Sequence, residues 1–324
     1  MTTETTCFVI PHKGREHLLA ATLRSISKLV LSPKQKIEVI VVTQNTALSR
    51  ETLSAASDLP LQVIPAEETL TIAALRNLGA QNSDSEYLAF LDADIKVSTN
   101  WLTSLLPFLK EDTGVAIASA MQEGGETVTE LEKIRINLSN LTVDRSLQFL
   151  PGRNLLMRRT TFCSVHGFPE HLVTCEDYFF TDKVSELGAL WYSSRASYVH
   201  LGEDKTYAEL FRKEIWRGQS NLQSLRNRDI KLREWPSFIV PPFITLVGLL
   251  SVALMLANHL YFGLAFAFLA ALPFTAYAVR LYRMSSDDVS ICAILGFYCC
   301  YFPARAWGTA IGVFKDLGDN LHDR

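Results

Sequence analysis

Two aspartates follow an apolar run in the first third of the sequence, and their type and spacing suit metal chemistry. The run spans 87–91, and Asp92 and Asp94 come directly after it. Side chains two residues apart on an extended strand project to the same side. Such a pair supplies the hard oxygen ligands that Mg²⁺ or Mn²⁺ prefers. The alternative is a strand-to-helix turn in which Asp94 only caps the helix or contacts solvent.

A second acidic pair, Glu176 and Asp177, lies in the second half of the chain. Thr174 precedes it in a position suited to capping a helix, and acids in a first turn favour helix formation. From the residues alone, this pair is most simply a helix start. A carboxylate at a helix start can also accept a proton from a hydroxyl when it projects into a cleft. The two interpretations are therefore compatible.

Arg76 and His200 have side chains that suit anion or metal contacts. A guanidinium matches phosphate geometry, so Arg76 is a candidate for a diphosphate contact, with an ion pair on a helix surface as the alternative. His200 ends a predicted strand, and a neutral imidazole can complete the ligand set of Asp94. A lone histidine is also often purely structural.

The elements that must position these residues alternate along the first half of the chain. Apolar, β-rich runs predict strands at 7–10, 37–42, 61–64, 87–91 and 115–118. Helical patterns lie between them at 16–30, 71–81 and 101–109. This alternation predicts an α/β fold with a mostly parallel central sheet covered on both faces. Ligands bind such sheets at the carboxyl ends of the strands, which is where the first acidic pair falls.

The last third of the chain predicts a membrane region. A basic stretch, 212–233, leads into two uncharged runs of twenty residues each, 238–257 and 260–279. About 20 apolar residues cross a bilayer, so these runs predict a transmembrane helical hairpin. Basic residues at both outer ends place those ends in the cytoplasm. In a third apolar segment, 289–314, Arg305 favours an interfacial or re-entrant helix over a third span.

Bulk properties bound the function further. The 324 residues suffice for one large domain, assigned to residues 1–228, and a membrane region at 229–324. A net charge of −3 gives no reason to expect a nucleic-acid partner. The polar N-terminus lacks the features of a secretory signal, so the domain at 1–228 is expected in the cytoplasm. The six cysteines lack zinc-like spacing and are expected to be reduced.

Several of these segments together resemble the family 2 glycosyltransferases in their order and spacing. The segments are Phe8-Val9-Ile10-Pro11, the helix from Glu16, Val39-Ile40-Val41-Val42, Arg76-Asn77-Leu78-Gly79, the run from Tyr87 to Asp94, the run from Gly152 to Arg159, Gly167-Phe168 and Glu176-Asp177. The resemblance implies a Rossmann-like, GT-A type fold. It also implies a nucleotide-diphosphosugar donor and a divalent metal ion, Mn²⁺ or Mg²⁺.

The same resemblance implies roles for individual residues. It puts Asp92 near the nucleotide ribose, Asp94 on the metal and Asp177 in the role of catalytic base, supported by Glu176. Related enzymes often place a late histidine at the metal or the diphosphate, and His200 would match it. A single displacement with inversion at the anomeric carbon follows from these roles.

The nucleotide pocket is where the chain departs from the family. Pro11 and Lys13 follow the first strand, where the family contacts the nucleotide, although Lys13 is equally well explained as a solvated loop charge. After the second strand, the usual acidic residue is replaced by the neutral Gln44. Its amide offers both a donor and an acceptor to a base edge, but the identity of the base stays open.

The expected function is the inverting transfer of one sugar to a membrane-associated acceptor. The acceptor is expected to be a lipid-linked glycan, in cell-surface polysaccharide synthesis at the inner (plasma) membrane. A hairpin beside the catalytic domain raises the effective concentration of such an acceptor. The segment 211–219 is an amphipathic helix against the bilayer or an acceptor contact, and it lacks the Gln-x-x-Arg-Trp motif of processive synthases. Two alternatives stay open: a polyprenyl-phosphate sugar transferase, and a non-catalytic membrane scaffold.

Overall fold

A computed structural model describes residues 3–110, 114–219, 232–285 and 289–322. The chain divides into two compact units. The first unit is made of Met1–Thr127 with Ser139–Glu203, and the second of Val128–Leu138 with Asp204–Arg324. Both acidic pairs lie in the first unit, and the apolar helices lie in the second. Of the basic stretch that precedes the hairpin, residues 220–231 lie outside the described residues.

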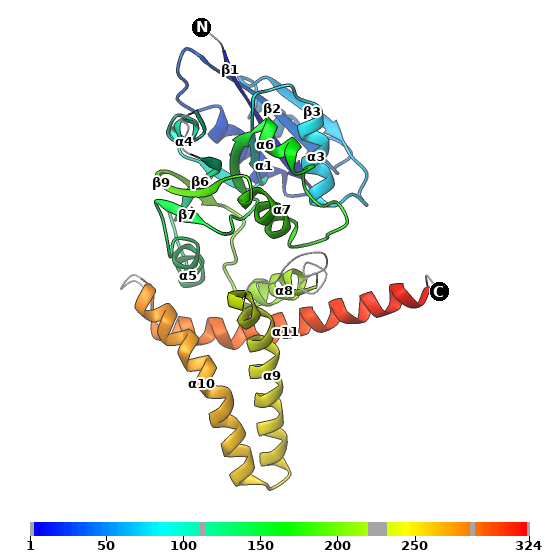
Figure 1. The fold of residues 1–324 in the computed structure, drawn as a ribbon, viewed down its shortest axis with the longest axis vertical. Coiled ribbons are helices and arrows are strands. Elements are labelled where there is room, and N and C mark those ends of the chain that lie inside the picture. The colour runs from blue at the N-terminus through cyan, green and yellow to red at the C-terminus, as the bar shows by residue number, and fades with distance from the viewer. Residues whose placement is uncertain (1–2, 111–113, 220–231, 286–288, 323–324) are drawn as a thin grey trace. The chain divides into compact units, whose positions relative to one another are not determined.

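The first unit is built on one mixed sheet (Figure 1). Its strands are β1 (Glu4–His12), β2 (Gln35–Thr43), β3 (Leu61–Pro65), β4 (Tyr87–Leu91), β5 (Ile95–Val97), β6 (Val115–Glu123), β7 (Arg145–Leu147), β8 (Asn154–Arg158) and β9 (Ala189–His200). They are ordered β3-β2-β1-β4-β8-β6-β9-β5, and β7 pairs with β9. The strands β3, β2, β1 and β4 are parallel, as predicted, whereas β8 runs antiparallel to both of its neighbours.

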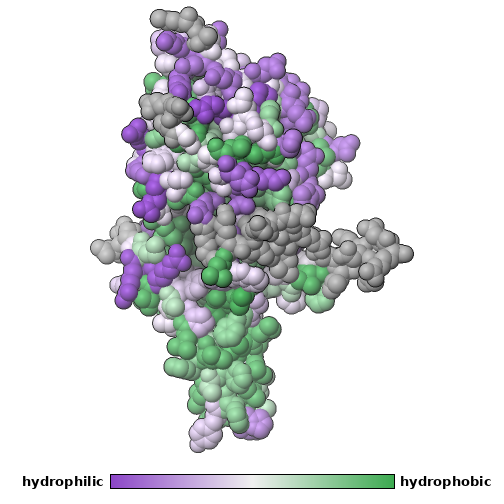
Figure 2. Space-filling view, in the orientation of Figure 1, coloured by the Kyte–Doolittle hydropathy of each residue, from purple (hydrophilic) through white to green (hydrophobic). Residues whose placement is uncertain are grey.

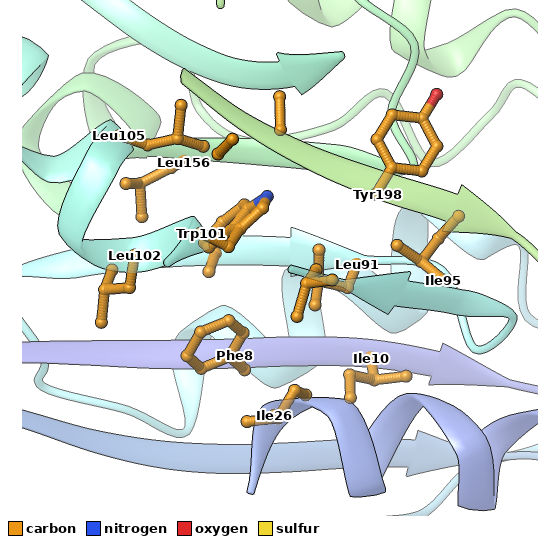
Figure 3. Packing of buried hydrophobic residues seen from close by; sticks show 14 of the residues in the cluster. Phe8, Ile10, Ile26, Leu91, Ile95, Trp101, Leu102, Leu105, Leu156 and Tyr198 are labelled. Carbon is orange, nitrogen blue, oxygen red and sulfur yellow. The ribbon is translucent and has the colours of Figure 1, made fainter. Parts of the chain in front are cut away.

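Helices connect and cover these strands. They are α1 (Glu16–Ile26), α2 (Arg50–Ser54), α3 (Ile72–Gln81), α4 (Trp101–Lys110), α6 (Arg159–Ser164) and α7 (Glu176–Ser185). Strand β1 is buried on both faces, so its alternating side chains enter two different cores. Phe8 packs against Trp101 of α4, with 5.7 Å between ring centroids (Figure 3). Val9, on the opposite face, belongs to a second core that includes side chains of α3, α6 and α7. Because β1 is buried on both faces, its sequence is a continuous apolar run rather than an alternation of apolar and polar residues.

The second unit contains an antiparallel pair of apolar helices, α9 (Trp235–Leu256) and α10 (Leu260–Met284). Among the described residues, these are the two helices long and apolar enough to cross a membrane. The predicted apolar runs fall on them, and the face of the hairpin seen in Figure 2 is largely hydrophobic, with polar side chains at its tip. Asn258 turns the chain between them with a φ of 62°, a left-handed conformation that asparagine tolerates.

The remaining helices of this unit are α5 (Glu130–Ser139), whose last residue is assigned to the first unit, α8 (Tyr207–Gly218) and α11 (Ile291–His322). The third apolar segment lies on α11, which runs across the hairpin rather than along it (Figure 1). Glycines bring α11 close to α8: a Cβ atom on Gly308 would lie 2.2 Å from the carbonyl oxygen of Ile215. Small residues allow two helix backbones to approach this closely.

Candidate active site

Arg76 of α3 joins the two acidic pairs. Its Nη2 lies 2.8 Å from Oδ1 of Asp92, directly after β4, and its Nη1 lies 2.7 Å from Oε1 of Glu176, the first residue of α7. The Arg76 side chain is only 2% exposed. One buried guanidinium therefore ties the carboxyl end of a central strand to the start of a distant helix.

Close packing holds this guanidinium in place. It lies over the ring of Phe168, 5.1 Å from the ring centroid. On another side, a Cβ atom on Gly152 would lie 3.0 Å from Nη2 of Arg76. Arg76 was predicted to contact the donor diphosphate. Both of its terminal nitrogens contact carboxylates, and each of them carries a second N–H besides the one that faces its carboxylate.

Asp177 is oriented by backbone groups. Its Oδ2 accepts a hydrogen bond from the Gly152 amide at 3.1 Å, and its Oδ1 accepts one from the Tyr178 amide at 2.8 Å. Burial and the charge of Asp177 raise the pKa of Glu176 to about 7, although Arg76 opposes the shift. The Glu176 carboxyl therefore holds its proton more tightly than an exposed glutamate does.

The second predicted site residue after β4, Asp94, lies beside His200. The pairing of β5 with β9 sets Ile95 opposite His200, which brings the imidazole to the turn that carries Asp94. The His200 Nε2 atom is 3.5 Å from Oδ1 of Asp94, and Nδ1 is 2.9 Å from Oε2 of Glu203. Burial alone would lower the pKa of His200, but hydrogen bonds to Asp94 and Glu203 outweigh it and raise the pKa. Glu203 therefore fixes the orientation of the ring.

The donor set at Asp94 and His200 fits a divalent metal ion in part. Across the described ranges, no group of three or more His, Cys, Asp or Glu side chains forms a metal cluster. One carboxylate and one imidazole suit Mn²⁺ or Mg²⁺ when the other ligands are water and substrate phosphate. The second oxygen of Asp94 lies 3.2 Å from Nη2 of Arg15. Gly202 makes room for that oxygen, since a Cβ atom there would lie 2.1 Å away from it.

Arg153, Gly202 and Glu203 were not among the predicted site residues. Arg153 places Nη1 3.1 Å from Nδ1 of His200 and 3.6 Å from Glu203. Its own pKa is raised, because Tyr198 and several acidic side chains, Asp92 and Asp177 among them, outweigh the effect of burial. Arg153 lies in the run from Gly152 to Arg159, and Glu203 follows His200 by three residues. Neither position in the sequence indicates a contact with His200.

The predicted nucleotide contacts lie at the ends of β1 and β2. These strands are neighbours, with Pro11 opposite Val42. Pro11 is buried, and Lys13 is exposed with its Nζ 3.4 Å from the Glu68 carbonyl oxygen. Gln44 donates from Nε2 to the carbonyl oxygens of Glu67 and Leu70, at 2.7 and 2.9 Å. Its amide therefore anchors the loop after β3.

These strand ends and acidic pairs define a nucleotide-sugar transferase domain of the GT-A type. The chain belongs to glycosyl transferase family 2, whose family model matches residues 7–172, just over half of the sequence. The family and the fold class predicted from the sequence are therefore confirmed.

Two curated relatives and one solved structure illustrate this placement. Glycosyltransferase AglE of Haloferax volcanii is 26% identical over 212 residues, covering 62% of this chain and 68% of AglE. The pre-mycofactocin glycosyltransferase of Mycobacterium tuberculosis is 24% identical over 204 residues, 60% of this chain but 43% of that protein. Mannosyltransferase PcManGT from Pyrobaculum calidifontis, solved in complex with GDP-Man and Mn²⁺, aligns over 100% of this chain and 88% of its own, with a TM-score of 0.56 and 17% identity. This last likeness shows the fold.

Proposed function

We propose that the protein is an inverting, metal-dependent glycosyltransferase that moves one sugar from a nucleotide-diphosphosugar to a lipid-linked glycan acceptor at the membrane. The observation that carries the proposal is the Arg76 bridge, in which one guanidinium contacts both Asp92 and Glu176. In this assignment Asp92 belongs to the donor side and Asp177, next to Glu176, to the acceptor side. The contact of Arg76 with both acids supports a common site for donor and acceptor.

On the donor side, Pro11, Lys13 and Gln44 would contact the nucleotide, and Asp92 its ribose. Asp94 and His200 would hold the Mn²⁺ or Mg²⁺ ion. When bound, such an ion neutralises the negative charge that builds up on the departing diphosphate. The Mn²⁺ and GDP-Man in the PcManGT complex support a metal and a sugar nucleotide for a domain of this fold.

On the acceptor side, Asp177 would act as the general base. Its carboxylate takes the proton of the acceptor hydroxyl while that oxygen forms a bond to the anomeric carbon. The bond from the anomeric carbon to the diphosphate oxygen breaks on the opposite face, so the configuration inverts. The two amide hydrogen bonds to Asp177 hold its carboxylate in a fixed orientation for this transfer.

The membrane acceptor is supported by the second unit. Two helices able to cross a bilayer follow the catalytic fold in the same chain, and a tethered domain meets lipid-linked acceptors at high effective concentration. In this proposal the catalytic unit lies on the cytoplasmic side of the plasma membrane, and α11 is interfacial.

The test is Asp177→Asn, assayed for sugar transfer to a lipid-linked acceptor with the full-length protein in lipid nanodiscs. We expect the rate to fall by about 10²–10⁴-fold, the usual contribution of a general base. Sugar-nucleotide affinity should change by less than about threefold, because the donor side is intact. Glu186→Gln, an exposed acid at the end of the same helix, is the matched control.

Wild-type turnover in Asp177→Asn would contradict the base assignment. If that turnover used bare polyprenyl phosphate, a polyprenyl-phosphate sugar transferase would replace the proposal, since a phosphate acceptor needs no base. Absence of both donor binding and donor hydrolysis in the wild-type protein, with Mn²⁺ present, would indicate a non-catalytic scaffold.

A further inference from the structure

Gln122, near the end of β6, is only 2% exposed and is held in place by its backbone. Its amide donates to Oδ1 of Asn140 at 3.1 Å and to the hydroxyl of Tyr192 at 3.0 Å. Its carbonyl oxygen accepts a hydrogen bond from Nδ2 of Asn140 at 2.7 Å. The position of Gln122 is therefore fixed without any contribution from its side chain.

The side-chain amide of Gln122 is oriented by two hydroxyl groups. Its Oε1 accepts hydrogen bonds from Oγ of Ser139 at 2.9 Å and from the hydroxyl of Tyr198 at 3.3 Å. Because Oε1 accepts both, the nitrogen of the amide faces the other way. There Nε2 donates to Oε2 of Glu203 at 3.3 Å. A buried glutamine thus contacts the carboxylate that orients His200.

Strand pairing brings these groups together. Gln122 of β6 lies opposite Tyr198 of β9, past an irregularity in the register of the two strands. Tyr198 and His200 are two positions apart on β9, so they project to the same side of the strand. The ring of Tyr198 belongs to a hydrophobic core, and its hydroxyl points away from the labelled apolar side chains (Figure 3). The polar end of Tyr198 therefore lies on the side of the strand that carries His200.

Two different partners lie at Nδ1 of His200. Oε2 of Glu203 is 2.9 Å away, and Nη1 of Arg153 is 3.1 Å away. A carboxylate accepts a hydrogen bond from Nδ1–H, whereas an arginine only donates and needs Nδ1 without its proton. With Arg153 as the partner, the proton of a neutral ring moves to Nε2, the atom that faces Asp94. The partner at Nδ1 therefore decides whether Nε2 presents a lone pair.

We propose that Gln122 is a positioning residue for His200 and acts through Glu203. By holding Oε2 of Glu203, it favours the contact in which Nδ1 keeps the proton and Nε2 presents its lone pair beside Asp94. Partners that orient a metal-binding histidine in this way affect metal affinity by about 10–100-fold. The inference rests on the metal role proposed above for Asp94 and His200, although the orientation of the ring is measurable without a metal.

The first experiment measures Mn²⁺ affinity by isothermal titration calorimetry, with the full-length protein in lipid nanodiscs and no donor present. Gln122→Met keeps a side chain of similar size and removes the amide. We expect Mn²⁺ to bind about tenfold more weakly. Tyr192→Phe is the matched control, because it removes a hydrogen bond from the backbone of Gln122 and leaves the amide in place. It should weaken binding less than about threefold, and equal losses in the two variants would overturn the proposal.

A double-mutant cycle tests whether Gln122 acts through Glu203. Glu203→Gln alone should weaken Mn²⁺ binding about tenfold. Adding Gln122→Met to it should cause a further loss of less than about twofold, since the contact that it breaks is already altered. Losses that multiply would overturn the proposal. If Gln122→Met fails to fold, Tyr198→Phe removes one of the two hydroxyls that orient the amide, and should weaken binding about threefold.

The second experiment needs no metal. In protein labelled with ¹⁵N-histidine, NMR measures how fast Nδ1–H of His200 exchanges with water, with the signal assigned through His200→Gln. Exchange should be slow in the wild type and in Tyr192→Phe, and at least about tenfold faster in Gln122→Met. Equal exchange in the wild type and Gln122→Met would overturn the proposal. A wild-type protein with slow exchange but no Mn²⁺ binding would contradict the proposed metal dependence, and the role of Gln122 at His200 would stand if Gln122→Met exchanged faster.

Discussion

Arg76 and Glu176 are one hundred positions apart in the sequence, and they form a buried ion pair with 2.7 Å between Nη1 and Oε1. The same guanidinium holds Asp92 through its other terminal nitrogen. The end of β4 and the first turn of α7 therefore share one positive charge. A substitution of Arg76 therefore removes an ion-pair partner from both acidic pairs.

Arg76→Lys should impair both stability and transfer. A lysine amine cannot contact two carboxylates with the fixed fork of a guanidinium, and a broken buried pair costs about 3–5 kcal/mol. We expect the free energy of unfolding, measured by urea denaturation, to fall by about 3 kcal/mol. The transfer rate should fall by at least about tenfold, since both acids lose their orientation. Arg145→Lys on the exposed β7 should change stability by less than about 0.5 kcal/mol. Equal stability of the two variants would show that the bridge is not needed.

The pH dependence of stability should report on Glu176. Its pKa in the folded protein, about 7, lies above the ordinary value of 4.5, so the folded state holds this proton more tightly than the unfolded chain does. The stabilisation that results is fully present below about pH 4.5 and is lost as the pH rises through about 7. Thermal unfolding of the wild-type protein and Glu176→Gln between pH 5 and 8 tests this. The wild type should lose stability relative to the variant as the pH rises. If the melting temperatures of the two proteins changed with pH in the same way, the raised pKa of Glu176 would be contradicted.

Gly202→Ala should displace the proposed metal ligand, Asp94, while leaving its carboxylate in the sequence. The added Cβ atom would lie 2.1 Å from Oδ2 of Asp94, so the carboxylate has to move. We expect Mn²⁺ affinity in the presence of the donor, measured by isothermal titration calorimetry, to fall by about tenfold or more. Gly125→Ala is the control, because its Cβ atom would make only an ordinary 3.6 Å contact with Val199. Unchanged affinity in Gly202→Ala would argue that Asp94 does not bind the metal.

Gly308→Ala tests the close contact of α11 with α8. Alanine normally stabilises a helix interior by about 0.5–1 kcal/mol relative to glycine. Here the new Cβ atom would lie 2.2 Å from a backbone oxygen, that of Ile215, so we expect a loss of about 1–3 kcal/mol instead. Gly248→Ala on α9 meets nothing within 4 Å and should be neutral or stabilising. Thermal unfolding in one detergent compares the two, and a stabilising Gly308→Ala would contradict the packing.

Much of the fold was predictable because its signals are local. The predicted strand runs fall on β1 to β4 and β6, and Asp92 and Asp94 follow β4 as expected. The antiparallel direction of β8 was not predicted. An apolar run such as Asn154–Arg158 has the same pattern in either direction, and only its neighbours β4 and β6 decide how it is paired.

The contacts of the charged side chains were less predictable. Sequence patterns drew attention to Arg76 and His200 but not to their partners. Glu203 and Arg153 at His200, and Glu176 at Arg76, are brought together by strand pairing and helix packing far along the chain. The position of Arg305 within the third apolar segment was visible in the sequence, whereas its pairing with Glu214 was not.

The sequence by itself determined strands β1 to β4 and β6, the acidic pairs and the two apolar runs, because hydrophobic periodicity and segment length act locally. It also determined the family, through the order of its motifs. Only the tertiary structure decided which charges meet. A guanidinium or a carboxylate loses most of its solvation on burial, so its partner is selected by whichever opposite charge the fold brings within reach. For Arg76, those charges are Asp92 and Glu176.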